Sequence, residues 1–431
     1  GNSKKLTSSS TGNAINVNAP GTVTITDITI EGAAAYALNA TTAVEVLEST
    51  LSAGGALKAT NNKVFVQNSD LLGTGKMNVI SVAEKVTFNF EGGSIKSTAQ
   101  AGDEDFFIIG GDCSGATFSI MATGIELGGA ENYLSLNTEA NTVKVHSSFE
   151  PAFNNKGYAT TKKGNFMYVY NAVARVNDKN YTTLAAALDA ATDASTVELL
   201  WADYKAPIAM NGTVAGNKTV TITGTAKVDW DKGFLFVGRN AEGNGKVIFY
   251  NANLTSISNS KAYGFNVSGS KLNDNTTNDG TVEIKNSTIE LDYMINKGTM
   301  LLDNSTLTVK NGFSVTGRVA SESATGLDAT ATMTLTNGSK VVVNNLNGMG
   351  IGYEAYGVMD IEATSTFEAT QSFLVGAKGT MNIAGTATIA NALTNNGQVN
   401  VAGIANLAAL TNNGQVNVAG GTVKVASGKT L

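Results

Sequence analysis

The chain contains one twelve-residue segment twice. The sequence ALTNNGQVNVAG runs from Ala392 to Gly403 and returns unchanged from Ala409 to Gly420, an offset of 17 residues. Within it Val399 and Val401 alternate with polar residues, which is the period of a β-strand. The flanking Asn and Gly residues tolerate the positive φ angles of turns. Self-similarity at so short a period is typical of a solenoid, in which each repeat stacks on the last.

Similar strand-like segments recur along the whole chain. Neighbouring segments are commonly about 17 to 22 residues apart, with some gaps near 30. The segments are GTVTITD from Gly21, AVEVLES from Ala43, KVFVQNS from Lys63, KVTFNFE from Lys85, KTVTITG from Lys218, KVIFYNA from Lys246, GTVEIKN from Gly280, GTMLLDN from Gly298, ATMTLTN from Ala331, GVMDIEA from Gly357 and GTMNIAG from Gly379.

A second spacing indicates how each repeat is built. Apolar residues recur five positions apart, which would place them on opposite faces of one straight strand. Both can face inward only if the chain turns a corner between them, and Asn, Ser and Thr at the intervening positions form such turns. The pairs are Val46 and Leu51, Val66 and Leu71, Ile284 and Ile289, and Leu302 and Leu307, and the corners are Glu48-Ser49-Thr50, Asn68-Ser69-Asp70, Asn286-Ser287-Thr288 and Asn304-Ser305-Thr306.

Each repeat thus consists of a strand, a corner, a second strand and a more variable loop. Stacked in register, such repeats predict an all-β chain folded as a right-handed parallel β-helix. Each coil would lie about 4.8 Å above the previous one. Identical side chains would then form vertical ladders, Val on Val in the core and Asn on Asn at the corners. The scarcity of proline agrees with this, because central strands cannot lose an N–H, and the chain has only three.

One segment, from Tyr181 onward, has helical periodicity instead. Leu184, Leu188 and Ala191 share a face at i, i+4 and i+7, and Thr182 or Thr183 can cap the start, which predicts a short helix near 182–192. The phrase YTTLAAALDAATDASTVELL resembles the opening of pectin-lyase-like right-handed β-helix domains of bacterial surface proteins. The residues that match are Tyr181, Thr183, Leu184, Ala187, Leu188, Ala190, Ala191, Thr196, Val197, Leu199 and Leu200. The resemblance implies that the helix covers an open end of the solenoid, whose strand edges would otherwise be unpaired.

Because this cap lies in the middle of the chain, we expect two β-helix blocks. The first covers residues 1–173, and the second covers residues 174–431 and opens with the helical cap. A single continuous helix with this segment as a lateral insertion is the alternative.

Composition limits the partners and the cellular site. The net charge of −6 disfavours nucleic acid, whose phosphates require a basic surface. No stretch approaches 18 consecutive apolar residues, so we expect no transmembrane segment. No signal peptide is visible, and the opening Gly1-Asn2-Ser3 is typical of a trimmed chain, so any targeting signal is expected to have preceded it.

The resemblance also raises the question of catalysis, since many pectin-lyase-like proteins are polysaccharide lyases or hydrolases. Such enzymes need an acid and a base, and for the lyases a cation to stabilise the substrate carboxylate. The three arginines Arg175, Arg239 and Arg318 have no regular spacing, and the chain has no Asn-Thr-Asp, Asp-Asp or Gly-His-Gly motif of the polygalacturonase kind. No residue here matches the catalytic pattern of the family, so we expect no enzymatic activity and no cofactor.

Two local clusters remain as binding hypotheses. Asp103, Glu104 and Asp105 could hold a Ca²⁺ ion, because hard cations favour clustered carboxylates. The alternative, which the lack of any known Ca²⁺-loop spacing favours, is a solvated loop before a strand. Asp229, Trp230, Asp231 and Arg239 could form a ligand site in which an exposed Trp stacks on a sugar ring. The alternative for this Trp is an edge residue folded over the solenoid.

These observations predict a non-enzymatic bacterial cell-surface or secreted protein, either an adhesin or a display scaffold. The expected partners are glycans or proteins of a host or its matrix. The alternative is a polysaccharide-binding or polysaccharide-degrading protein of lyase or hydrolase type on the same fold, which rests on analogy of fold alone.

Overall fold

The structure is a computed structural model. It describes residues 4–426 except 61–62, 76, 84, 99–106, 111–115, 121–131, 135–141, 147–157, 164–165, 202–205, 239–244, 268–279, 318, 320–328 and 348. Long parallel sheets wrap about 329° around an axis, so the chain is a parallel β-helix, as the repeats predicted. It divides into two compact units, which are described separately. Unit 1 spans Gly1–Ala172, and unit 2 comprises Val173–Trp201 and Pro207–Leu431.

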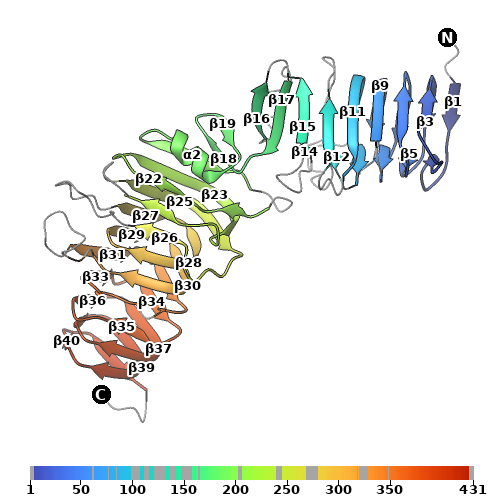
Figure 1. Cartoon of the computed structure of the whole chain (residues 1–431). Coiled ribbons are helices and arrows are strands. Elements are labelled where there is room, and N and C mark those ends of the chain that lie inside the picture. The colour runs from blue at the N-terminus through green and yellow to red at the C-terminus, as the bar shows by residue number, and fades with distance from the viewer. Residues whose placement is uncertain are drawn as a thin grey trace. The chain divides into compact units, whose positions relative to one another are not determined.

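Unit 1 contains two stacks of parallel strands that share one core (Figure 1). The only antiparallel pairs among its described strands are those that β17 makes with β15 and β16. The first stack consists of β1 (Lys4–Thr7), β3 (Val23–Thr26), β4 (Ile28–Glu31), β6 (Val44–Leu47), β7 (Thr50–Ala53), β9 (Lys63–Gly73), β11 (Thr87–Ser97), β13 (Thr117–Ile120), β15 (Thr142–His146), β16 (Tyr158–Lys163) and β17 (Phe166–Asn171). The second consists of β2 (Ile15–Val17), β5 (Tyr36–Ala40), β8 (Gly55–Ala59), β10 (Ile80–Val82), β12 (Phe107–Gly110) and β14 (Asn132–Leu134).

Unit 2 opens with a β-hairpin, the helix and the coils that follow (Figure 1). The hairpin is β18 (Ala174–Val176) and β19 (Lys179–Tyr181), and helix α2 is Leu184–Ala190. The remaining strands are β20 (Ser195–Leu199), β21 (Ile208–Ala209), β22 (Gly212–Val214), β23 (Thr219–Asp229), β24 (Leu235–Val237), β25 (Lys246–Ser256), β26 (Phe265–Val267), β27 (Thr281–Lys285), β28 (Thr288–Asn296), β29 (Thr299–Asp303), β30 (Thr306–Val315), β31 (Thr330–Thr336), β32 (Lys340–Val343), β33 (Tyr356–Ile361), β34 (Thr366–Ala369), β35 (Phe373–Val375), β36 (Gly379–Ile383), β37 (Thr386–Asn395), β38 (Gln398–Val401), β39 (Ile404–Asn412), β40 (Gln415–Val418) and β41 (Thr422–Val425).

The duplicated segment stacks directly on itself. In β37 and β39, Leu393 pairs with Leu410, and in β38 and β40, Val399 pairs with Val416. The amides form the expected ladders, because Asn395 Nδ2 donates to Asn412 Oδ1 at 2.8 Å. Asn417 likewise donates to Asn400 at 2.8 Å, and Asn400 to Asn382 at 2.7 Å. The repeat therefore encodes two equivalent coils of the helix.

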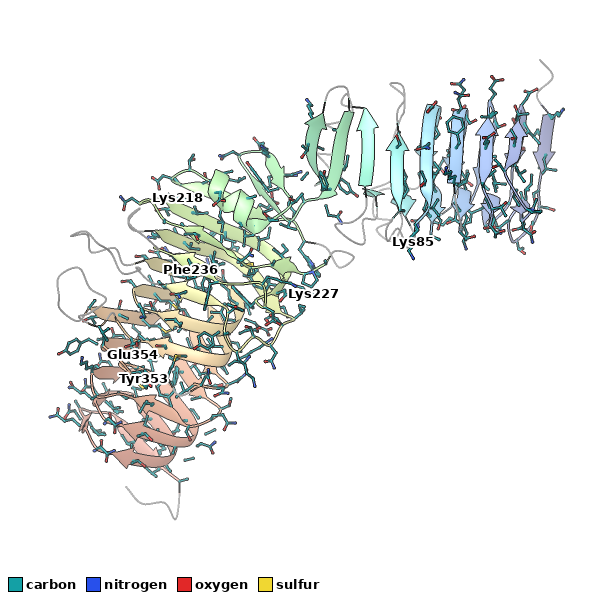
Figure 2. All side chains as sticks on the ribbon, in the orientation of Figure 1. Lys85, Lys218, Lys227, Phe236, Tyr353 and Glu354 are labelled. Atoms are coloured by element: carbon teal, nitrogen blue, oxygen red, sulfur yellow. The ribbon has the colours of Figure 1, made fainter. Side chains whose placement is uncertain are left out.

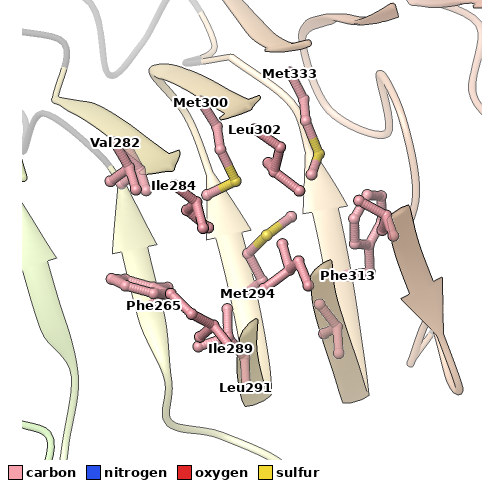
Figure 3. Close-up of a cluster of buried hydrophobic side chains, with 14 of the residues drawn as sticks. Phe265, Val282, Ile284, Ile289, Leu291, Met294, Met300, Leu302, Phe313 and Met333 are labelled. Carbon is pink, nitrogen blue, oxygen red and sulfur yellow. The ribbon is translucent and has the colours of Figure 1, made fainter. Parts of the chain in front are cut away.

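The corners also fold as the five-residue spacing predicted. All eight paired apolar residues are 0% exposed. The first corner residue adopts the left-handed conformation in each case, with φ of 49° at Glu48, 45° at Asn68, 49° at Asn286 and 47° at Asn304. Since Asn tolerates this region better than most residues, its presence at three of these four corners has a direct steric reason. The bend lets both apolar residues face the same core, which Figure 3 shows for Ile284 and Ile289.

A buried serine follows the left-handed residue and links successive coils. The single O–H of Ser305 has two carbonyl oxygens in range, that of Asp303 at 2.8 Å and that of Ile284 at 2.9 Å. The same hydroxyl accepts the N–H of Ser287 in the preceding coil at 3.0 Å, and the Ser305 N–H in turn bonds Ser339 Oγ at 3.2 Å. At the corner, some backbone groups lose their hydrogen-bond partners in the sheet. The serines give these groups new partners.

Replacing Ser305 with Ala should therefore destabilise unit 2. The substitution leaves the buried N–H of Ser287 without its acceptor, so we expect a loss of about 1–3 kcal/mol in the free energy of unfolding, measured in urea. Thr308→Ala, on the strand β30 that follows this corner, is the matched control, because Thr308 is only partly buried and faces outward. Equal unfolding curves for the two variants would contradict the role of the serine ladder.

The predicted helix is confirmed and begins where expected. Thr183 is its N-cap, and its hydroxyl accepts the Ala186 N–H at 3.1 Å. Its buried residues Leu184, Ala187 and Leu188 join the core of unit 2 next to β22. At the other end, Lys218, labelled in Figure 2, donates to the carbonyl oxygen of Leu188 at 2.7 Å. A cation at a helix C-terminus is favourable for the helix dipole.

Candidate functional site

Trp230, the residue singled out as a sugar platform, lies in the core. Its side chain is 0% exposed, and its ring packs 5.5 Å from that of Phe265. The indole Nε1–H donates to the carbonyl oxygen of Glu290 at 3.1 Å, and the backbone N–H donates to Ser258 Oγ at 2.8 Å. Trp230 is therefore a core residue, neither the exposed stacking residue of the ligand-site hypothesis nor the edge residue folded over the solenoid that was its alternative. A ring that covers no solvent-facing surface cannot stack on a sugar.

The two aspartates beside Trp230 lie at the end of β23 and just after it. Asp229 is half-buried, and its Oδ1 accepts the N–H of Asp231 at 2.9 Å, which closes a local turn after β23. Asp231 is exposed. Arg239 lies outside the described residues. A ligand site formed by all four residues together therefore stays a prediction.

The predicted Ca²⁺ ligands Asp103, Glu104 and Asp105 also lie outside the described residues. Within the part of the chain that the structure describes, no group of three or more His, Cys, Asp or Glu side chains could hold a metal ion. In the same part of the chain, no helix is long and apolar enough to cross a membrane.

One charged cluster that sequence reasoning missed is formed by Glu290 and Asp292 of β28 and Lys310 of β30. Lys310 Nζ lies 3.7 Å from Asp292 Oδ1 and 3.9 Å from Glu290 Oε2. It also donates to the carbonyl oxygens of Ser256 at 2.8 Å and Ser258 at 3.3 Å. We call these three residues the Asp292 cluster. An acid, a second carboxylate and a cation on neighbouring coils are the groups that a polysaccharide-cleaving site would need.

The hydrogen bonds of the Asp292 cluster show what it does in the fold. Asp292 is 0% exposed, its Oδ1 accepts the Ser256 hydroxyl at 2.6 Å, and its Oδ2 accepts the Ser260 N–H at 2.7 Å. Glu290 Oε2 accepts the Ser256 N–H at 3.0 Å. Both carboxylates thus hold the segment that leaves β25. A fully buried carboxylate with donors on both oxygens has no direct access to a substrate proton.

The position of Asp292 explains why its role is not visible in the sequence. Leu291 is buried in the core, so strand alternation would turn Asp292 toward solvent. The pairing of β28 with β30 shifts register between Leu291 and Tyr293, however, and this irregularity places Asp292 inside.

A second charged group lies on the strand that precedes the corner. Glu283 of β27 forms ion pairs with Lys246 at 2.5 Å and with Lys285 at 2.6 Å. Burial acts to raise the pKa of the Glu283 carboxyl, but the hydrogen bonds and positive charges of the two lysines outweigh it and lower the pKa. Glu283 therefore stays ionised at neutral pH and serves as the shared partner of two lysines, not as a proton donor.

An open groove of about 580 Å³ lies farther along unit 2. One side is the segment that follows β32, with Asn344, Asn345 and Asn347, and the other is the start of β35, with Gln371 and Leu374. The volume is within the range of about 300–1,000 Å³ typical of small-molecule sites. We call it the amide groove.

Tyr293 of β28, two coils earlier in the stack, supports this groove. Its hydroxyl lies 3.4 Å from Met349 Sδ, and Met349 lines the groove. Burial raises the pKa of the Tyr293 hydroxyl, and a side-chain hydrogen bond with Asn347 partly offsets this. The ring lies against Gly312 one coil later, where an added Cβ would overlap it. Gly312 is therefore needed for the close approach of this aromatic ring.

No protein-family model, curated protein or solved structure matches the chain. The molecule is thus characterised by its own geometry, as a parallel β-helix whose charged residues stabilise the coils and whose uncharged polar residues line an open groove.

Proposed function

We propose that the chain is a non-enzymatic β-helix scaffold of a bacterial cell-surface or secreted protein, similar to the pectin-lyase-like adhesins. The observation that carries this proposal is the state of the Asp292 cluster. Its buried carboxylate has a donor on each oxygen, and its lysine binds two backbone carbonyls. The acid and base groups that come closest to a catalytic arrangement are therefore engaged in holding the fold.

The architecture supports a display role. The coils are joined by parallel strand pairing, by the buried serine ladder and by amide ladders at the outer surface. Such a stack is stable through contacts between nearest neighbours and presents its side chains in fixed rows. Glycans or proteins of a host or its matrix are the proposed partners, and the cell exterior is the proposed location.

The second function, a polysaccharide-degrading enzyme, is favoured only by the presence of two carboxylates and a lysine within one cluster. Glu290 is the member that remains partly accessible, with a side chain 35% exposed. An enzyme on this site would require Glu290 to act without the help of Asp292, whose side chain is 0% exposed.

A binding screen coupled to a product assay tests the proposal. The purified chain is applied to an array of glycans and matrix proteins, and each glycan that binds is incubated with the protein and assayed for reducing ends and unsaturated uronides. We expect binding without product. Product that disappears in Glu290→Gln would overturn the proposal and establish the enzymatic alternative. Absence of any binding would remove the adhesin role and leave only the scaffold.

A further inference from the structure

The amide groove combines exposed side-chain amides with apolar surface. The described residues that line it carry no charged side chain. Asn344, Asn345, Asn347 and Gln371 are exposed there, and each carries an amide with two donors and one acceptor carbonyl. Leu374 is partly buried and contributes apolar surface beside them. Exposed amides next to aliphatic surface match a ligand that has both hydroxyl groups and apolar C–H faces.

The wall of the groove is held in place before any ligand arrives. The Asn347 N–H bonds Asn345 Oδ1 at 3.0 Å, and the Met349 N–H bonds the Leu346 carbonyl oxygen at 3.2 Å. From the next coil, Thr370 Oγ1 donates to the Asn344 carbonyl oxygen at 3.2 Å. The amide oxygens of the groove are engaged as well, since Gln371 Oε1 accepts Asn391 Nδ2 at 3.1 Å and Thr370 Oγ1 lies 3.5 Å from Asn344 Oδ1. The side-chain NH2 donors of Asn344, Asn345 and Gln371 are the groups that remain for a ligand. Because the wall is ordered in advance, less conformational entropy is lost when a ligand binds.

The strands beside the groove leave no backbone edge for a peptide. β32 pairs with β30 on one side and β34 on the other. β35 pairs with β37, and its Val375 also pairs with Ile351. A peptide that binds by strand addition needs an unpaired edge. A peptide therefore cannot bind by adding a strand to β32 or β35, which favours a sugar over an extended peptide.

We propose that the amide groove binds a neutral oligosaccharide, whose hydroxyl groups bond Asn344, Asn345 and Gln371 while a C–H face packs against Leu374. The inference rests on the proposed adhesin-like function and names the ligand class and its site. A uronic acid polymer is excluded as the ligand, because its carboxylates would find no cation among the described groove residues.

The test uses the full chain and defined probes. Neutral gluco-, manno-, xylo- and galacto-oligosaccharides, oligogalacturonates and a peptide library are screened for binding, and dissociation constants are measured by isothermal titration calorimetry. The binding-site variant is Asn344→Ala combined with Gln371→Ala, both exposed positions. The matched control is Asn413→Ala combined with Gln415→Ala, two exposed amides far along the chain from the groove residues. A further variant, Leu374→Glu, places a charge against the C–H face.

We expect a neutral oligosaccharide to bind the native chain and the control alike, and the groove variants to weaken it about tenfold or more, the effect of losing roughly one or two hydrogen bonds. Neutral oligosaccharide binding that the groove variants leave unchanged would overturn the site. Binding only to oligogalacturonates or peptides, or no binding to any probe, would overturn the ligand class. Release of sugar product is a separate outcome, which would overturn the non-enzymatic function itself.

Discussion

Replacing Trp230 by Ala is expected to lower the free energy of unfolding of unit 2 by about 3–5 kcal/mol, the cost typical of removing a large buried aromatic side chain. The ring is 0% exposed and packs against Phe265, and its Nε1–H satisfies the carbonyl oxygen of Glu290. The substitution would remove the packing and the hydrogen bond together. Urea unfolding followed by far-UV circular dichroism measures the loss.

The matched control for this experiment is Tyr353→Ala. Tyr353 is an aromatic residue of unit 2 that is 53% exposed (Figure 2), so its removal should change the unfolding free energy by no more than about 0.5 kcal/mol. Similar small losses in both variants would mean that Trp230 is at the surface, and the sugar-stacking hypothesis would have to be restored.

The second large effect is expected at Lys310. Lys310→Met leaves the fully buried carboxylate of Asp292 without its cation and removes the lysine donor from the carbonyl oxygens of Ser256 and Ser258. Breaking a buried pair by removing one partner costs about 3–5 kcal/mol. The lysine side chain is 25% exposed, so we expect the lower end of this range. The measurement is again the free energy of unfolding in urea.

Two further variants show whether the loss in Lys310→Met comes from the buried charge of Asp292. Lys340→Met breaks the ion pair with Glu368 at 2.8 Å, in which both side chains are about 40% exposed, and should cost at most about 1 kcal/mol. Combining Lys310→Met with Asp292→Asn removes the buried negative charge and should recover part of the loss. If Lys310→Met and Lys340→Met were equally mild, the Asp292 cluster would not stabilise the coil.

The coil architecture could be predicted because its signals are local. At each corner the left-handed residue, the following Ser and the two apolar residues lie within six consecutive positions, such as Leu302 to Leu307. The same holds for α2, where Thr183 and the apolar face are contained in one short segment. The burial of Trp230 also agrees with local alternation, because Ala226 and Val228 of β23 and Trp230 directly after the strand lie at every second position, and all three are buried.

The contacts between distant coils could not be predicted in this way. Lys310 bonds the carbonyl oxygen of Ser256, 54 residues earlier, and Trp230 bonds that of Glu290, 60 residues later. Coil lengths vary, since Gln398 pairs with Gln415 but Lys246 pairs with Thr281. The sequence therefore does not determine which loops meet. The register shift that buries Asp292 adds a further uncertainty, because it reverses the side expected from alternation.

The amide groove could not be predicted for the same reason, because it is formed by residues of different coils. Its two sides come from the segment after β32 and the start of β35, in consecutive coils, and its support comes from Tyr293 of β28. Each of these residues is an ordinary polar or aromatic residue in its own segment. Their relation follows only when the coils are placed in register, which is why no single segment of the sequence predicts this groove.

The most direct test of the coil register is a deletion of residues 392–408, which removes one complete copy of the duplicated segment and its linker. Asn391 is then followed by Ala409, so the remaining copy takes the place of the first and every strand keeps its partner type. We predict that the shortened chain unfolds cooperatively, with the same far-UV circular dichroism per residue as the native chain. A deletion of residues 392–400, about half a coil, should instead disrupt the end of unit 2, because it moves core residues out of register. If the complete-coil deletion were as disruptive as the half-coil deletion, the coils would not be equivalent units and the stacked-repeat account would be contradicted.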